Sequence, residues 1–216
     1  MRNLNSWEML SQVILAGKDS AGRANTHVVL MGMGEPLDNY DEVIAFVHAL
    51  REQLGISPRR VTLSTCGLVP AIRRLAEEGL PLTLSVSLHA PEDAIRSKIM
   101  PINHTYPLSM LLPAMHDYAR ATGRRVSVEY TLIKGLNDST ETARQLAELI
   151  GSDFHVNLIP VNPVEGKGWE APGKARVEGF RKVLASRGVN ATVRRGLGLE
   201  IDGSCGQLRR RTAKNN

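Results

Sequence analysis

Short apolar segments alternate with longer amphipathic segments along most of this chain. The apolar segments have the length and β-branched content of strands. They lie at 27–33, 60–64, 82–88, 126–133, 155–159 and 190–194. The other segments repeat apolar residues at helical spacing. They predict helices at 7–16, 40–53, 69–78, 92–98, 108–122, 139–150 and 174–187. Strands that alternate with helices predict a parallel sheet with helical connections, an α/β fold.

Polar and small residues follow the predicted strands at the points where the strands end. These residues are Gly32, Gly34 and Glu35, then Ser64, Thr65, Cys66 and Gly67, then Ser87, His89 and Pro91, then Lys134, Gly135, Asn137 and Asp138, and finally Asn162 and Pro163. The carboxyl ends of parallel strands meet at one edge of a sheet or barrel, where active sites lie. We therefore expect a functional site at this edge.

Glu35 is the most informative of these residues. An apolar run ends in two glycines, and the carboxylate follows at once, held by Pro36. Glycine lets a ligand approach the backbone closely, and α/β enzymes present polar groups to ligands at strand ends. A strand that ends in an ordinary turn would carry the same residues. For His89 too, a structural role as a hydrogen-bonded residue at a strand end is the alternative to contact with a ligand. Ser87 and His89 leave a Ser/His/Asp hydrolase open, although residues two apart on a strand share a face without forming a dyad.

Composition indicates one globular domain with a substantial core, since 42% of the 216 residues are hydrophobic. No apolar run approaches the roughly 20 residues of a membrane span, and no secretion signal opens the chain. The two cysteines are far apart in sequence and lack the spacing of metal ligands, which argues against a structural zinc. We expect a cytoplasmic protein without membrane contact.

The net charge of +5 comes with pairs and runs of arginine. They are Arg59-Arg60, Arg73-Arg74, Arg124-Arg125, Arg194-Arg195 and Arg209-Arg-Arg211. Contact with a phosphate backbone would use such residues, and so would a surface whose charge keeps the protein soluble. Charge alone favours the second interpretation.

Cys205 lies in a small, polar, glycine-flanked segment, whereas buried cysteines usually lie in apolar elements. This setting indicates an accessible thiol, and Arg194 and Arg195 are near enough in sequence to lower its pKa. Cys66 lies at a strand end where any small buried residue would serve. Motifs of the Rossmann, P-loop, zinc-protease and α/β-hydrolase types are missing from the sequence.

Seven stretches together resemble the radical S-adenosylmethionine (SAM) methyltransferases, which methylate carbon 2 of an adenosine in 23S rRNA and in certain tRNAs. The stretches are Arg2-Asn-Leu4, Met31-Gly-Met-Gly-Glu-Pro-Leu37, Val61-Thr-Leu-Ser-Thr65, Ser87-Leu-His-Ala-Pro91, Met100-Pro-Ile-Asn103, Asn157-Leu-Ile-Pro160 with Asn162-Pro163, and Cys205-Gly-Gln-Leu208. They follow the family's order over essentially the whole chain. A sister family that methylates carbon 8 of the same ribosomal adenosine shares most of them, and it stays an alternative.

The resemblance implies a parallel partial (βα) barrel of the radical-SAM type and assigns roles to its residues. Gly34 and Glu35 would hold the amino end of the methionine part of SAM. The rest of the SAM pocket would consist of Ser64, Ser87, Leu88, His89 and Asn162. Cys205 would accept a methyl group from one SAM molecule. A radical derived from a second SAM would then take hydrogen from that methyl group, and the resulting carbon radical would add to adenine. Cys66 receives no catalytic role.

One departure from the family pattern concerns the iron–sulfur cluster. Family members carry a CxxxCxxC motif shortly before the segment matching 2–4, and its three thiolates hold a [4Fe–4S] cluster. The two cysteines of this chain cannot replace that motif, so we predict no metal-binding residue in this chain. We therefore expect 1–216 to be one radical-SAM core domain without the family's first strand, cluster loop and N-terminal RNA-binding region.

The parent enzyme would act on 23S rRNA and tRNA and would need an electron donor for its cluster. The chain alone would then be inactive. The alternative from another functional class is a non-catalytic remnant that binds SAM or RNA.

Overall fold

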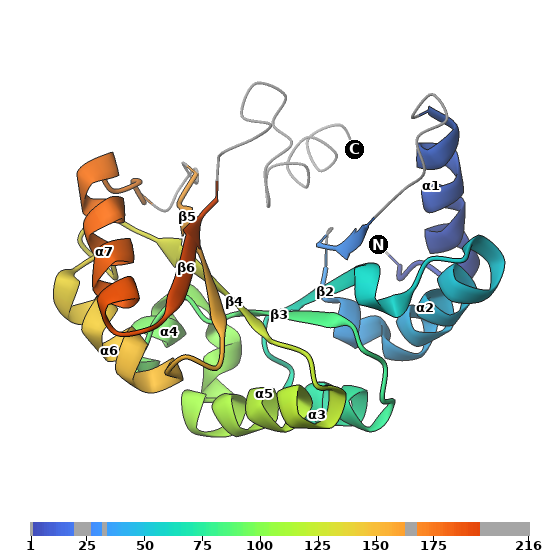
Figure 1. Ribbon diagram of the computed structural model, residues 1–216, viewed down its shortest axis with the longest axis horizontal. Helices are drawn as coiled ribbons and strands as arrows, with labels where there is room; N and C mark the ends of the chain where they lie inside the picture. The colour runs from blue at the N-terminus through green and yellow to red at the C-terminus, as the bar shows by residue number, and fades with distance from the viewer. Residues whose placement is uncertain (1, 20–26, 32–33, 163–167, 195–216) are drawn as a thin grey trace.

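Six parallel strands form a curved sheet in the order β1-β2-β3-β4-β5-β6 over the residues that the structure describes (Figure 1). The structure is a computed structural model, and it describes residues 2–19, 27–31, 34–162 and 168–194. The strands are β1 (Val28–Leu30), β2 (Val61–Thr65), β3 (Thr83–Ser87), β4 (Ser127–Leu132), β5 (His155–Pro160) and β6 (Asn190–Val193). Within the described residues β1 and β6 do not pair with each other, so the sheet is an open, partial barrel.

Helices connect the strands and cover the convex side of the sheet (Figure 1). They are α1 (Ser6–Asp19), α2 (Tyr40–Leu54), α3 (Val69–Glu77), α4 (Asp93–Ile99), α5 (Leu108–Thr122), α6 (Thr140–Ile150) and α7 (Lys174–Ser186). Three short 3-10 helices are η1 (Pro36–Asn39), η2 (Pro58–Arg60) and η3 (Pro101–His104). Among the described residues, none of the helices combines the length and hydrophobicity of a membrane span.

The α/β fold predicted from the alternating pattern is confirmed, and most predicted element ends lie within one residue of the observed ones. The first helix is an exception, because α1 continues past Gly17 to Asp19. Lys18 lies in its last turn, where a cation interacts favourably with the helix dipole. The first strand is the other exception. Its ladder with β2 covers Val28–Leu30, whereas the sequence predicted 27–33, of which residues 32–33 lie outside the described residues.

The two faces of the sheet differ in polarity. In β2, Val61, Leu63 and Thr65 are buried, whereas Thr62 and Ser64 are half-buried on the opposite face. Successive strand residues point to opposite faces, so one face packs on the helices and the other is polar. Parallel sheets are usually apolar on both faces. The polar face, called the concave face below, is therefore the unusual feature of this fold.

Arg96 of α4 joins the carboxyl ends of two neighbouring strands. Its fully buried guanidinium donates to the carbonyl oxygens of Cys66 (3.0 Å), Ser87 (3.2 Å) and Leu88 (3.2 Å). It also donates to Asn103 Oδ1 (2.7 Å) and to the carbonyl of Tyr106 (3.3 Å). Burial lowers the pKa of this guanidinium, and five oxygen acceptors compensate for its lost hydration.

Gly67 allows Arg96 to approach the end of β2. Its φ of +105° is in the region that favours glycine. A Cβ atom at this position would lie 3.2 Å from Arg96 Nη2 and 3.2 Å from Leu111 Cδ1. The glycine at the strand end therefore serves a close packing contact as well as a turn.

Replacing Arg96 should destabilise the fold strongly. Arg96→Met keeps side-chain length but leaves five buried oxygens without their donor, which should reduce the free energy of unfolding by about 3–5 kcal/mol. Urea denaturation followed by circular dichroism measures this loss. The matched control is Arg120→Met, because Arg120 makes an exposed ion pair with Asp117 on α5 and should contribute less than about 1 kcal/mol. An Arg96→Met protein as stable as the control would contradict the role assigned to Arg96.

Candidate functional site

Glu35 links the ends of β1 and β2. It caps the first turn of η1, where Oε1 accepts a hydrogen bond from the backbone N–H of Leu37 (3.1 Å). Oε2 accepts from the backbone N–H of Cys66 across the gap to the next strand end (2.7 Å). A carboxylate offers about four acceptor positions. The two N–H groups fix the orientation of the side chain and leave acceptor capacity for a ligand.

Gly34 precedes Glu35 in a conformation that side chains rarely adopt. Its φ is +96°, and no atom would lie within 4 Å of an added Cβ. Glycine is therefore required here by the backbone, which turns the chain so that Glu35 faces β2. The sequence left open whether this segment is an ordinary turn or presents a carboxylate to a ligand. The two interpretations are compatible, because the turn at Gly34 orients the carboxylate of Glu35.

Ser64, Ser87 and Leu88 occupy β2 and the exit of β3. Ser64 is half-buried on the concave face, in register with Ser85 of β3. Ser87 is the last residue of β3 and pairs with Glu129 of β4. Leu88 is fully buried, and its backbone N–H and carbonyl bond to Glu129 and Arg96. Ser64 and Ser87 can reach a ligand by their hydroxyls, whereas the polar groups of Leu88 are already used.

His89 has a fixed hydrogen-bonding role. It is a non-glycine residue with a φ of +62°, and its Nδ1 accepts from the backbone N–H of Thr131 (3.0 Å). Its own carbonyl accepts from Asn137 Nδ2 (2.8 Å). Burial, with a smaller contribution from the nearby Arg96, lowers the pKa of the imidazole to about 4. At neutral pH the ring is thus uncharged with its proton on Nε2, so it can donate a hydrogen bond but is poorly suited to act as a base.

Asn137 holds the exit of β4 in place. Its Nδ2 donates to the carbonyls of His89 and Thr131, and its Oδ1 accepts from the backbone N–H of Ile133 (2.7 Å). Its own carbonyl accepts from the hydroxyl of Tyr130. Because Asn137 is fully buried and its side-chain amide is bonded, we assign it to the support of His89.

The two cysteines differ in what the structure says of them. Cys66 lies beside Glu35, and burial together with that carboxylate raises the pKa of its thiol to about 12. A protonated thiol is a poor nucleophile, in accord with the absence of a predicted catalytic role. Cys205 lies outside the described residues. Asn162 lies just beyond the end of β5, at the same edge as Ser87 and Glu35, and is half-buried.

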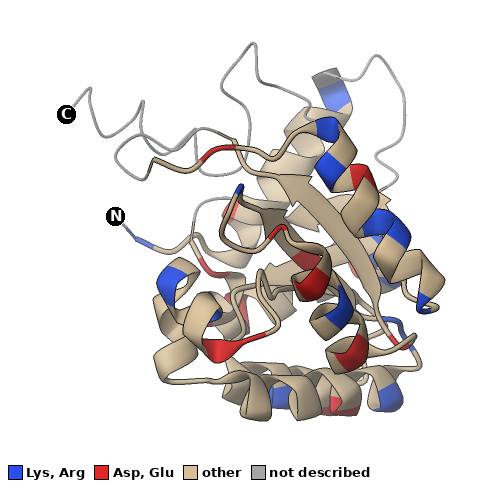
Figure 2. Cartoon of the chain, turned by 90° about the vertical axis from the view of Figure 1, so that its left-hand side faces the viewer, with Lys and Arg blue, Asp and Glu red and all other residues tan. Residues whose placement is uncertain are grey.

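Several arginines of the pairs noted in the sequence bond to other residues of this chain. Arg74 forms an ion pair with Asp41 and lies over the ring of Tyr40. Arg124 donates to Thr83 Oγ1 (3.1 Å). Basic and acidic residues are interspersed along the outer helices (Figure 2), and Arg181 and Arg187 form ion pairs with Glu178 and Glu148. These contacts favour structural roles for the arginines concerned.

Glu129 is a candidate site residue that the sequence analysis missed. It lies on the concave face and is 5% exposed. Its Oε1 accepts from Ser85 Oγ (2.7 Å) and Asn157 Nδ2 (2.8 Å), which ties β3, β4 and β5 together. The available signal was the alternation of Ser127, Glu129 and Thr131 in a strand that was expected to be apolar.

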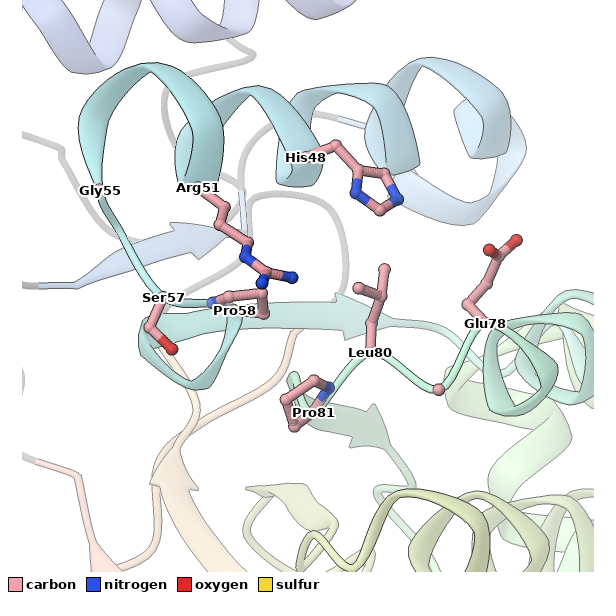
Figure 3. A pocket seen from close by; sticks show the side chains of 9 residues that line it. His48, Arg51, Gly55, Ser57, Pro58, Glu78, Leu80 and Pro81 are labelled. Atoms are coloured by element: carbon pink, nitrogen blue, oxygen red, sulfur yellow. The ribbon is translucent and has the colours of Figure 1, made fainter.

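A hollow lies at the opposite edge of the sheet from these residues (Figure 3). This cavity of about 620 Å³ is at the amino ends of β2 and β3, where His48 and Arg51 of α2 face Ser57, Pro58 and Leu80. In barrels of this class, active sites form at the carboxyl ends of the strands. We therefore place the candidate site around Glu35, Ser87 and His89.

Metal ligands are not grouped in the part of the chain that the structure describes. Among those residues, no three His, Cys, Asp or Glu side chains come together in a way that could hold a metal ion. The chain as a whole has two cysteines. A [4Fe–4S] cluster on three thiolates thus does not fit the residues of this chain.

Comparison with known proteins gives consistent results. The family model of the radical SAM superfamily matches residues 3–147. A probable dual-specificity RNA methyltransferase RlmN of Desulforudis audaxviator is 54% identical over 98% of this chain and 67% of its own length. A protein with the same description from Pelotomaculum thermopropionicum is 50% identical over 98% of this chain and 58% of its own length. This chain thus spans about three fifths to two thirds of these relatives.

Solved structures agree with the sequence comparison. The crystal structure of a radical SAM methyltransferase from Sphaerobacter thermophilus superimposes with a TM-score of 0.92 at 45% identity, over 96% of this chain and 62% of that protein. A domain of a pyruvate-formate lyase-activating enzyme from Bacteroides vulgatus gives a TM-score of 0.60 at 19% identity and shares the fold.

The half-buried His89, whose imidazole pKa is lowered, should make stability fall as the pH falls. Unfolded histidine takes up a proton below a pKa of about 6.5, whereas folded His89 resists protonation down to about 4. The unfolded state thus binds more protons in this window. Between pH 7 and pH 5, His89 should reduce the free energy of unfolding by roughly 2 kcal/mol.

The measurement is urea denaturation of the wild type and His89→Asn at both pH values. Asparagine tolerates a positive φ and supplies an acceptor, so the variant should fold and lose this part of the pH dependence. The control His104→Asn removes an exposed histidine and should keep the dependence. The same pH dependence in His89→Asn as in the wild type would show that His89 is not the group responsible.

Proposed function

Because this chain belongs to the radical SAM superfamily and, within it, to the family of the RlmN methyltransferases, we propose that it is the SAM-binding core of an RNA methyltransferase. The relatives are described as dual-specificity RNA methyltransferases, which supports RNA as the substrate class. The motif resemblance described above suggests an adenosine in 23S rRNA and tRNA as the target. The observation that carries the proposal is the Glu35 carboxylate, fixed by two backbone N–H groups at the strand exits, with acceptor capacity to spare.

In this proposal, Glu35 accepts hydrogen bonds from the ammonium group in the methionine part of SAM. Gly34 supplies the turn that brings the ligand close to the backbone. The hydroxyls of Ser64 and Ser87 and the amide of Asn162 provide further hydrogen bonds. His89 contributes the N–H at Nε2, since Nδ1 is already engaged with Thr131. Leu88 supports the pocket by packing.

Cys205 is the proposed acceptor of a methyl group. The Cys205 sulfur, as a thiolate, would attack the methyl carbon of bound SAM. The new carbon–sulfur bond would form as the bond between the methyl group and the sulfonium breaks, and S-adenosylhomocysteine would leave with that electron pair. The contrast with Cys66 supports this choice, because the carboxylate of Glu35 and burial keep the Cys66 thiol protonated. Of the two cysteines in the chain, Cys205 is thus the better candidate.

A second candidate function is that of a SAM-binding chain without radical chemistry of its own. The cysteine count favours it, because three thiolates hold the cluster of the family and this chain has two cysteines. The cluster supplies, when bound, the electron that cleaves SAM. The residues of this chain do not fit it, so we derive no step through it and propose that 1–216 acts as the SAM-binding core.

Removing the charge of Glu35 should weaken SAM binding. Glu35→Gln can still accept from the backbone N–H of Cys66, so the strand ends stay linked, but the charge-assisted bond to the ammonium group is lost. We expect the dissociation constant of SAM to rise by at least about tenfold in isothermal titration calorimetry. The control Glu52→Gln changes an exposed glutamate of α2 and should bind like the wild type. Equal affinity of Glu35→Gln and the wild type would contradict the anchoring role.

The purified chain should not acquire a cluster. After anaerobic reconstitution with iron and sulfide, we expect no stoichiometric absorbance near 400 nm, because the two cysteines of the chain cannot supply the three converging thiolates that hold such a cluster. A full-length family member with the CxxxCxxC motif, treated in parallel, should show that absorbance. A stable cluster on the 216-residue chain would contradict the proposal of a SAM-binding core without radical chemistry.

A further inference from the structure

Glu129 has a carboxylate oxygen that the described residues leave without a hydrogen bond. Oε1 is occupied by Ser85 and Asn157, as described above. Oε2 is also buried, and none of the described residues donates a hydrogen bond to it. Burying an ionised oxygen without compensation is unfavourable. Oε2 therefore needs an explanation beyond the linking of three strands.

Arg194 offsets the charge of Glu129 only in part. Its Nη1 lies 3.9 Å from Glu129 Oε2, which is too far for a hydrogen bond. The side chain of Arg194 is 48% exposed, whereas that of Glu129 is 6% exposed. Water screens the cation more than the anion, so the concave face keeps a net negative potential near Oε2.

The position of Glu129 relates it to the proposed SAM pocket. Glu129 pairs in register with Ser87, a proposed SAM contact. The guanidinium that approaches Glu129 also reaches Met31 Sδ (3.8 Å), and Met31 lies four residues before Glu35. The carboxylate therefore faces the side of the sheet where the chain leads into the SAM anchor.

We propose that Glu129 is a specificity-determining residue that favours the cationic sulfonium of SAM over the neutral sulfur of S-adenosylhomocysteine, the product left after methyl transfer. This inference rests on the proposed function, because it assumes that SAM binds on the concave face. The physical basis is the attraction between a buried anion and a cation several ångströms away, which does not require direct contact. Such a preference would help product to leave and new SAM to bind.

The test compares two ligands that differ in the charge on sulfur. Dissociation constants of SAM and S-adenosylhomocysteine are measured by calorimetry for the wild type, Glu129→Gln and Arg194→Gln. Glutamine keeps an acceptor oxygen for Ser85 and Asn157 but removes the charge. Glu129→Gln should lower the preference for SAM by about tenfold, whereas Arg194→Gln should raise it several-fold. The control Glu148→Gln, on the exposed side of α6, should leave the ratio unchanged.

Each outcome has a defined meaning. Equal weakening of both ligands in Glu129→Gln would show a purely structural role and overturn the inference. If Glu129→Gln does not fold, an unchanged ratio in Arg194→Gln overturns it instead, because Arg194 is half-exposed and dispensable for packing. If the wild type binds neither ligand, the proposed SAM site is wrong and this inference fails with it. If the wild type binds both and the ratios stay fixed, only the inference fails.

Discussion

The buried guanidinium of Arg96 is the interaction on which the geometry of the candidate site depends. It comes from α4 and bonds to the carbonyl oxygens at the ends of β2 and β3. A neutral side chain could not satisfy five acceptors, and a carboxylate partner would withdraw donors from the strand ends. Cys66 and Ser87 are thereby fixed relative to each other, and Cys66 in turn holds the carboxylate of Glu35. The buried guanidinium of Arg96 thus fixes, through Cys66, the position of the Glu35 carboxylate.

The sequence predicted the elements well because their signals are local. Helix α5 was placed at its observed ends from its apolar periodicity although it contains Pro113, and in the structure it ends at Gly123, whose φ is +63°. Glu35 and His89 were recognised as candidate site residues because glycine and polar residues at the ends of strands form a local sequence signal. The short β1 was overestimated. Its apolar run continues to Met33, whereas the ladder with β2 that defines the strand ends at Leu30, and a ladder is a property of two segments.

Arg96 and Glu129 could not be identified from sequence for the same physical reason. An arginine in a short helix normally lies in solvent, and a glutamate that alternates with apolar residues in a strand normally faces water. Both side chains are buried here because their partners come from other strands and helices. Their roles follow from tertiary contacts, such as the one between Glu129 and Asn157, which no local pattern encodes.

The polar concave face makes ligand binding separable from radical chemistry. Its side chains come from β2 to β6 and are held by bonds within the described chain, including Asn137 to His89 and Ser85 to Glu129. These bonds lie within the protein, and together with the bonds of Glu35 and His89 to backbone N–H groups they fix the orientations of the side chains. Binding to a site organised in this way costs little conformational entropy. Cluster ligation makes different demands, because three thiolates must converge on one group of iron atoms. The proposed SAM anchor therefore depends on the strand ends and on the helices that hold them, Arg96 of α4 among them, whereas a cluster would need thiolates that these residues do not supply.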